Sequence, residues 1–140
     1  MSYKDLLVMK KTNKISVNGI DYKKPEKPTI VICMDGVSQQ YIEEAIDFGK
    51  APTFERFKKE GFFGIAKDVI PSYTNPNNIS IITGVLPKVH GITTSGLLFN
   101  RGNGKYELIS SPEQIRCDTI LQKFHENGIK VASVTTKDKL

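Results

Sequence analysis

The chain has 140 residues, of which 39% are hydrophobic and 25% are charged. These values are typical of about one soluble globular domain, and they exclude a fibrous chain and argue against disorder. No apolar run approaches the roughly 18 residues that a membrane-spanning helix requires, and the N-terminal segment lacks the apolar core of a signal peptide. We therefore expect a cytoplasmic protein without a membrane partner.

The net charge of +5 is unevenly distributed. Residues 1–28 hold seven lysines against three acids, whereas residues 29–140 hold thirteen basic and twelve acidic side chains. A nucleic-acid-binding surface needs a basic stripe with interleaved aromatic residues, which this pattern does not offer. We expect no nucleic-acid partner and divide the chain into a lysine-rich leader with a β-hairpin, residues 1–28, and a domain, residues 29–140.

The first predicted elements are a hairpin and a strand. Residues 14–23 alternate apolar and polar side chains around Asn18-Gly19, which is the strongest short signal for a β-hairpin because both turn positions need a positive φ. Residues 29–36, with the sequence TIVICMDG, form a continuous β-branched run typical of a strand buried in a parallel sheet. Asp35 then lies at the carboxyl edge of that sheet, where ligands bind in open α/β folds.

Two helices, a strand and a third helix follow. The spacing of apolar residues predicts helices over residues 40–48 and 52–60, then a strand over residues 62–70. The string PSYTNPNNISIITG predicts a helix whose N-terminus lies at or just after Thr74 and which stops at Gly84.

The last part of the chain is predicted to hold a second hairpin over residues 97–109, a helix over residues 112–127 and a buried strand over residues 129–135. Ser110 and Glu113 match a capping box, and Gly128 suits the end of the helix. Cys33 and Cys117 form no CxxC pair and lie in apolar segments, so we expect buried thiols.

The alternation of strands and helices predicts an α/β fold, a parallel sheet with helices on both faces. The chain stops directly after an interior strand, which would leave a sheet edge uncovered. We therefore expect an incomplete domain that contains only the N-terminal strands and helices. A truncated gene product, one half of a split gene and a piece of an incomplete sequence all remain open.

Two side chains at element ends could carry chemistry. Asp35 after a buried strand could bind a metal ion, although a cap or an ion-pair partner is the commoner role of such a carboxylate. Thr74 lies where the backbone N–H groups and dipole of a helix favour an anion, although an N-cap is the commoner role of such a threonine. A threonine hydroxyl becomes a nucleophile only when a base or metal ion activates it.

The segments VICMDGV and PSYTNPNNISIITGVLPKVHGI together resemble the alkaline phosphatase superfamily, in its nucleotide pyrophosphatase/phosphodiesterase branch, and most closely the phosphonoacetate hydrolases. The resemblance runs from about Thr29 to Leu140. It implies a three-layer α/β/α core, a zinc-binding role for Asp35 and a metal-bridging nucleophilic role for Thr74. The expected reaction is hydrolysis of the C–P bond of phosphonoacetate to acetate and phosphate through a phosphothreonine.

The resemblance also implies substrate contacts. The string KDKL near the chain end places Lys137 and Lys139 where phosphonoacetate hydrolases bind the substrate carboxylate. Without the resemblance, the sequence favours solvated surface lysines as much as a substrate-binding pair. Ser95 stands where the family usually has an asparagine that donates to a phosphoryl oxygen, so we expect a weakened or water-mediated contact there. His90 and His125 are expected to be structural and on the surface, respectively.

The resemblance implies two Zn²⁺ ions, which need about six protein ligands. The family's Asp-x-x-x-His and Asp-His motifs do not occur in this sequence, which offers at most Asp35 and Thr74. We therefore do not expect the chain to be a competent enzyme alone, and its missing C-terminal part is an expected partner. Besides phosphonoacetate hydrolysis, a nucleotide pyrophosphatase or phosphodiesterase activity and a non-catalytic fragment remain alternatives.

Overall fold

The computed structural model describes residues 13–95, 97–99, 106–108 and 111–135, which form two separate compact units. The first unit contains the N-terminal hairpin and the described residues from Val69 onward, and the second unit contains residues 29–68. No helix among the residues described is long and apolar enough to cross a membrane.

The N-terminal hairpin consists of β1 (Lys14–Val17) and β2 (Ile20–Lys23), which pair antiparallel. Asn18 and Gly19 adopt φ values of 50° and 82°, so the predicted two-residue turn is confirmed. The alternation of side chains places Ile15 and Val17 on one face, and both are buried. The hairpin therefore has a covered apolar face, although its lysines are exposed.

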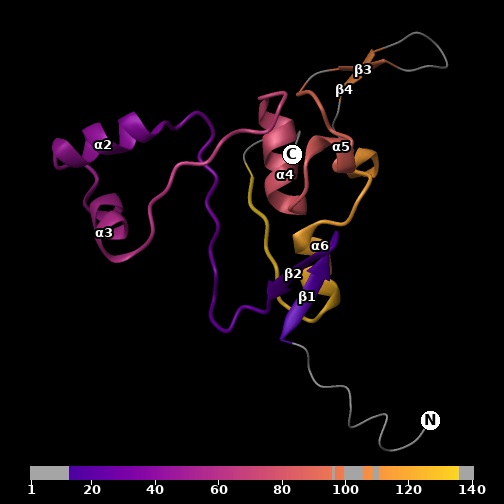
Figure 1. Ribbon diagram of the computed structural model, residues 1–140, viewed down its shortest axis with the longest axis horizontal. Coiled ribbons are helices and arrows are strands. Elements are labelled where there is room, and N and C mark those ends of the chain that lie inside the picture. Colours follow the sequence, from indigo (N-terminus) through magenta and orange to yellow (C-terminus); the bar gives the residue numbers. More distant parts are fainter. Residues whose placement is uncertain (1–12, 96, 100–105, 109–110, 136–140) are drawn as a thin grey trace, which may run out of the picture. The chain divides into compact units, whose positions relative to one another are not determined.

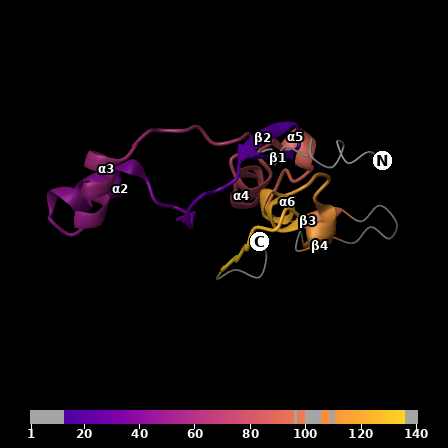
Figure 2. The ribbon, with the colours of Figure 1, turned by 90° about the horizontal axis from the view of Figure 1, so that it is seen from below.

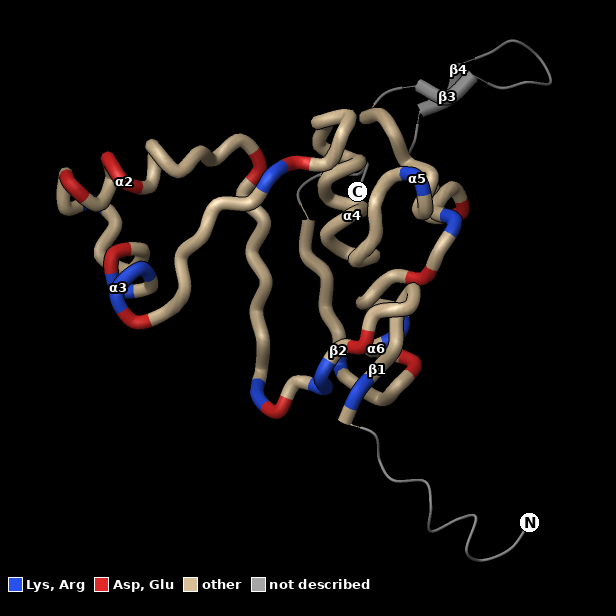
Figure 3. The backbone as a smooth tube through the Cα atoms, in the orientation of Figure 1, with Lys and Arg blue, Asp and Glu red and all other residues tan. Residues whose placement is uncertain are grey.

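The second unit contains α2 (Gln39–Asp47) and α3 (Pro52–Glu60), which confirm two predicted helices. The Ser38 hydroxyl accepts a hydrogen bond from the Tyr41 N–H and caps α2. The two helices lie side by side in both views of the ribbon (Figures 1 and 2). Figure 3 shows acidic residues along α2 and basic residues on α3, and Lys58 Nζ lies 3.0 Å from Glu43 Oε1.

In the first unit, α4 (Thr74–Thr83) leads through Gly84 into the short α5 (Pro87–His90). Ile79 and Ile92 form a small buried cluster, against which Ile82 and Ile115 are packed. The strands β3 (Leu97–Phe99) and β4 (Tyr106–Leu108) pair antiparallel as predicted, and the predicted turn between them lies outside the described residues.

The predicted helix over residues 112–127 is wrong in its first half. A short 3-10 helix covers Pro112–Gln114, and α6 (Ile120–Glu126) begins only after Thr119, whose hydroxyl accepts from the Gln122 N–H at 3.1 Å. The Arg116 N–H donates to the His90 carbonyl, and Asp118 bonds the Asn18 side chain. These tertiary contacts take backbone groups that a continuous helix would use.

The three predicted buried strands are also wrong among the residues described. Residues 29–36, 62–70 and 129–135 have no ladder, and within the described part of the chain the strands that pair belong to the two hairpins. Ile30, Val31 and Ile32 are 82%, 80% and 74% exposed. A buried strand needs hydrogen-bonded neighbours as well as an apolar sequence, and these runs lack such neighbours here. Cys33, which belongs to the first of these runs, is exposed, and Cys117 is only half-buried, so the prediction of two buried thiols is wrong.

Candidate functional site

Thr74 is the first residue of α4, as the sequence indicated. The preceding residue, Tyr73, is extended with φ −123° and ψ 161°, so the chain turns into the helix directly at Thr74. Pro76 lies in the first turn, where its missing N–H removes no intrahelical hydrogen bond. The half-buried Thr74 side chain therefore lies at the positive end of a ten-residue helix.

Ser95 is brought to the same end of the helix. Its Oγ accepts a hydrogen bond of 2.9 Å from the N–H of Asn75, the residue after Thr74. The first N–H groups of a helix have no intrahelical partner, and this contact satisfies one of them. The structure thus places two of the predicted site residues next to each other.

Asn77 fixes the approach of the chain to Thr74. Its Oδ1 accepts from the Val69 N–H at 3.1 Å, and its Nδ2 donates to the Tyr73 carbonyl at 2.9 Å. Asn77 belongs to the TNPNN string, but the sequence alone did not reveal this role. The preference of asparagine for bonds with nearby backbone groups is the signal that could have found it.

His90 is fully buried and joins α4 to the segment after α5. The Ile92 N–H donates to Nδ1 at 3.1 Å, so that nitrogen is unprotonated, and Nε2 donates to Ser80 Oγ at 2.9 Å. Burial lowers the pKa of His90, because the charged imidazolium would lose its hydration. These contacts agree with the structural role expected of His90 and leave the imidazole engaged at both nitrogens.

Asp35 belongs to a different unit from Thr74 and Ser95. Asp35 is exposed and precedes Gly36, whose φ is 78°, in the unit of residues 29–68. Thr74 belongs to the other unit. Lys137 and Lys139 lie outside the described residues.

A metal ion needs more protein donors than Asp35 and Thr74 provide. Asp35 and Thr74 supply oxygen atoms of a kind that zinc accepts, but a tetrahedral site takes about four ligands. The part of the chain that the structure describes contains no group of three or more His, Cys, Asp or Glu side chains that could hold a metal. These residues therefore do not form a metal site by themselves.

Comparison with known sequences relates the chain to a protein family. Residues 29–137 match the family described as type I phosphodiesterase / nucleotide pyrophosphatase. The human ectonucleotide pyrophosphatase/phosphodiesterase family member 1 is 29% identical over 108 residues, which are 74% of this chain and 12% of that protein.

Two solved structures are also similar. The crystal structure of phosphonoacetate hydrolase from Sinorhizobium meliloti 1021 in complex with phosphonoacetate has a TM-score of 0.84 and 42% identity, covering 90% of this chain and 30% of that chain. The complex with phosphonoformate has a TM-score of 0.76 and 41% identity, covering 82% and 28%. The chain thus spans less than a third of the length of each relative named here.

Proposed function

Because this chain belongs to the type I phosphodiesterase / nucleotide pyrophosphatase family, we propose that it contributes the nucleophile-bearing part of a phosphonoacetate hydrolase. Its fold is α/β and alkaline-phosphatase-like, represented in part. The observation that carries the proposal is Thr74 at the N-terminus of α4, with Ser95 beside it, in a chain 42% identical to a phosphonoacetate hydrolase.

In the proposed reaction, the Thr74 hydroxyl gives its proton to water as its oxygen attacks phosphorus, and the P–C bond breaks. The electron pair of that bond passes to the departing carbon, whose neighbouring carboxylate shares the charge before a proton from water completes acetate. Water then hydrolyses the phosphothreonine to phosphate and restores the hydroxyl. The positive end of α4 favours the phosphonate anion.

Ser95, Lys137 and Lys139 are proposed to orient the substrate. A hydroxyl that accepts one hydrogen bond can still donate its own hydrogen, so Ser95 can bond a phosphonate oxygen while it accepts from the Asn75 N–H. The family resemblance assigns the two lysines to the carboxylate of phosphonoacetate. Two positive charges at that position would also favour the negative charge that develops on the leaving group.

Members of this superfamily are metal-dependent in general. Two zinc ions, which the resemblance implies, would lower the pKa of the threonine hydroxyl and neutralise phosphonate charge. Asp35 and Thr74 are the residues of this chain proposed to contact them, with further ligands supplied by additional residues.

The test uses the protein encoded by the complete reading frame that contains residues 1–140. Phosphate release from phosphonoacetate is measured with added zinc, for the wild type and three variants. Thr74→Ala should reduce turnover to background, and Thr74→Ser should retain part of it. Thr53→Ala is the matched control, because Thr53 is an exposed threonine in the first turn of α3. Wild-type turnover in Thr74→Ala would refute the assignment of the nucleophile.

A second candidate is phosphodiester or pyrophosphate hydrolysis at the same threonine. It is favoured by the matched family and by Ser95, which replaces the asparagine that the resemblance leads one to expect. Faster turnover of a nitrophenyl phosphodiester than of phosphonoacetate, unaffected by Lys137→Ala, would select this activity.

A further inference from the structure

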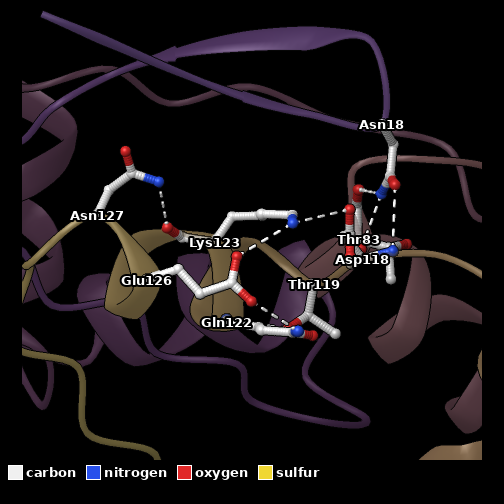
Figure 4. A network of polar contacts seen from close by, with 8 residues as sticks. All are labelled: Asn18, Thr83, Asp118, Thr119, Gln122, Lys123, Glu126 and Asn127. Carbon is white, nitrogen blue, oxygen red and sulfur yellow. Dashed lines mark hydrogen bonds and ion pairs between the residues drawn. The ribbon is translucent and has the colours of Figure 1, made fainter.

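The turn of the N-terminal hairpin makes contacts that the proposed chemistry does not use. Asn18 Nδ2 donates to the carbonyl of Thr83 and to the carbonyl of Asp118, both at 2.8 Å. Its Oδ1 accepts from the Asp118 N–H at 3.2 Å. Figure 4 shows this side chain directed from the hairpin toward Thr83 and Asp118.

The orientation of the Asn18 amide follows from its partners. The Asp118 N–H can only donate, so it must face Oδ1, and the two carbonyls can only accept, so they must face Nδ2. Three hydrogen bonds thus hold one side chain against two backbone segments, 65 and 100 residues away along the chain.

Both segments are ends of helices. Thr83 is the last residue of α4, and Asp118 lies just before the N-cap of α6. The last carbonyls of a helix lack intrahelical partners, so Asn18 supplies a donor that α4 itself cannot provide. The three hydrogen bonds of the Asn18 side chain, here called the clamp, therefore join the end of α4 to the start of α6 through the hairpin turn.

The hairpin that carries Asn18 is itself anchored. Ile15 and Val17 are only 3% and 1% exposed. The rings of Tyr22 and Phe124, on β2 and α6, meet edge to face with centroids 6.3 Å apart. The hairpin is thus a packed element of this unit and can hold α4 in place.

We propose that Asn18 is a positioning residue that sets the tilt of α4 and, through it, the place of Thr74; this proposal rests on the function proposed above. Ten helical residues span about 15 Å, so a tilt of about 4° at the clamped end moves the other end by about 1 Å. A displacement of that size in a reacting group can reduce a rate by about 100-fold. The contacts of Ser80 with His90 and of Asn75 with Ser95 also restrain α4, so we expect a smaller loss of about tenfold.

The variants distinguish the effect of the Asn18 hydrogen bonds from the effect of the turn conformation. Asn18→Gly removes all three hydrogen bonds, while glycine keeps the positive φ that the turn needs. Asn18→Asp keeps the shape but cannot donate to either carbonyl. Lys14→Ala is the matched control, because it removes an exposed ion pair with Asp21 from the same hairpin without touching α4.

The first measurement is the kinetics of phosphate release from phosphonoacetate by the protein encoded by the complete reading frame. Both Asn18 variants should lower kcat about tenfold and leave KM within about twofold, while Lys14→Ala should match the wild type. Wild-type kcat in Asn18→Gly would overturn the proposal. Loss of activity in Lys14→Ala as well would overturn it too, because the effect would then belong to the hairpin as a whole.

The second measurement needs no activity, so it separates this proposal from the proposed function. Backbone amide NMR signals are compared between the wild type and Asn18→Gly. A positioning role shifts the signals of Thr74 and Asn75 at the far end of α4. Changes confined to the surroundings of Thr83 and Asp118 would show a local structural role and refute the proposal, even in an inactive protein. Wild-type turnover that survives Thr74→Ala would refute the proposed function instead.

Discussion

Replacing His90 with leucine should destabilise the protein strongly. The imidazole is fully buried and bonds both the Ile92 N–H and Ser80 Oγ. Leucine is of similar size but forms neither bond. A buried donor left without a partner costs about 1–3 kcal/mol, and a lost hydrogen bond costs about 0.5–1.5 kcal/mol. We therefore expect His90→Leu to lower the free energy of unfolding by about 2–4 kcal/mol.

The assay is urea denaturation followed by circular dichroism at pH 7.5. His125→Leu is the control, because His125 is exposed on α6 and its replacement should change the free energy of unfolding by less than about 0.5 kcal/mol. A double-mutant cycle with Ser80→Ala should give a coupling energy of about 1 kcal/mol between the two side chains. A loss below about 1 kcal/mol in His90→Leu would refute the reasoning.

The titration of His90 should also make the stability of the protein depend on pH. Burial lowers the pKa of His90 in the folded protein, so the unfolded chain binds a proton at a higher pH than the folded chain does. The stabilisation is complete above the ordinary histidine pKa of about 6.5 and is lost as the pH falls toward the folded value. Denaturation curves between pH 5 and 8 should show this loss in the wild type and a flatter profile in His90→Leu. Equal profiles would contradict the assignment.

The remaining predictions concern the ends of α4 and α6. Gly84→Ala should destabilise more than Gly128→Ala, although both glycines have positive φ, because an added Cβ at Gly84 collides with the Tyr22 hydroxyl whereas that at Gly128 meets open space. In thermal melting, Gly128→Ala should lower the free energy of unfolding by about 1–2 kcal/mol, and Gly84→Ala should lower it further. Equal losses would show that the contact with Tyr22 does not matter. Thr119→Ala removes the cap of α6 and should cost about 1 kcal/mol in urea denaturation, whereas an unchanged midpoint would show that the cap is dispensable.

Local signals in the sequence predicted the elements that local interactions determine. Asn18-Gly19 fixes its turn through positive φ, and α3 spans Pro52–Glu60, the range that was predicted. The N-terminus of α4 at Thr74 was predicted in the same way. In each case the residues responsible lie within one or two turns of the element.

Interactions between distant residues explain most of what the sequence did not predict. The start of α6 depends on contacts of Asp118 with Asn18, and the contact of Ser95 with Asn75 joins residues 20 positions apart. An apolar run such as residues 29–36 indicates a tendency to be buried but does not identify the strand that would pair with it. The position of Thr74 at the start of α4 was therefore predictable, whereas the side chains that hold this helix were not.

The clamp at the hairpin turn also constrains the order in which the molecule can form during synthesis. The partner of Asn18, Asp118, is made 100 residues after Asn18 itself. At about 5–20 residues per second, that interval lasts about 5–20 s. During this time the hairpin and α4 can form locally, but the contact that fixes them to α6 cannot. The turn thus completes its hydrogen bonds only after about 100 further residues have been made.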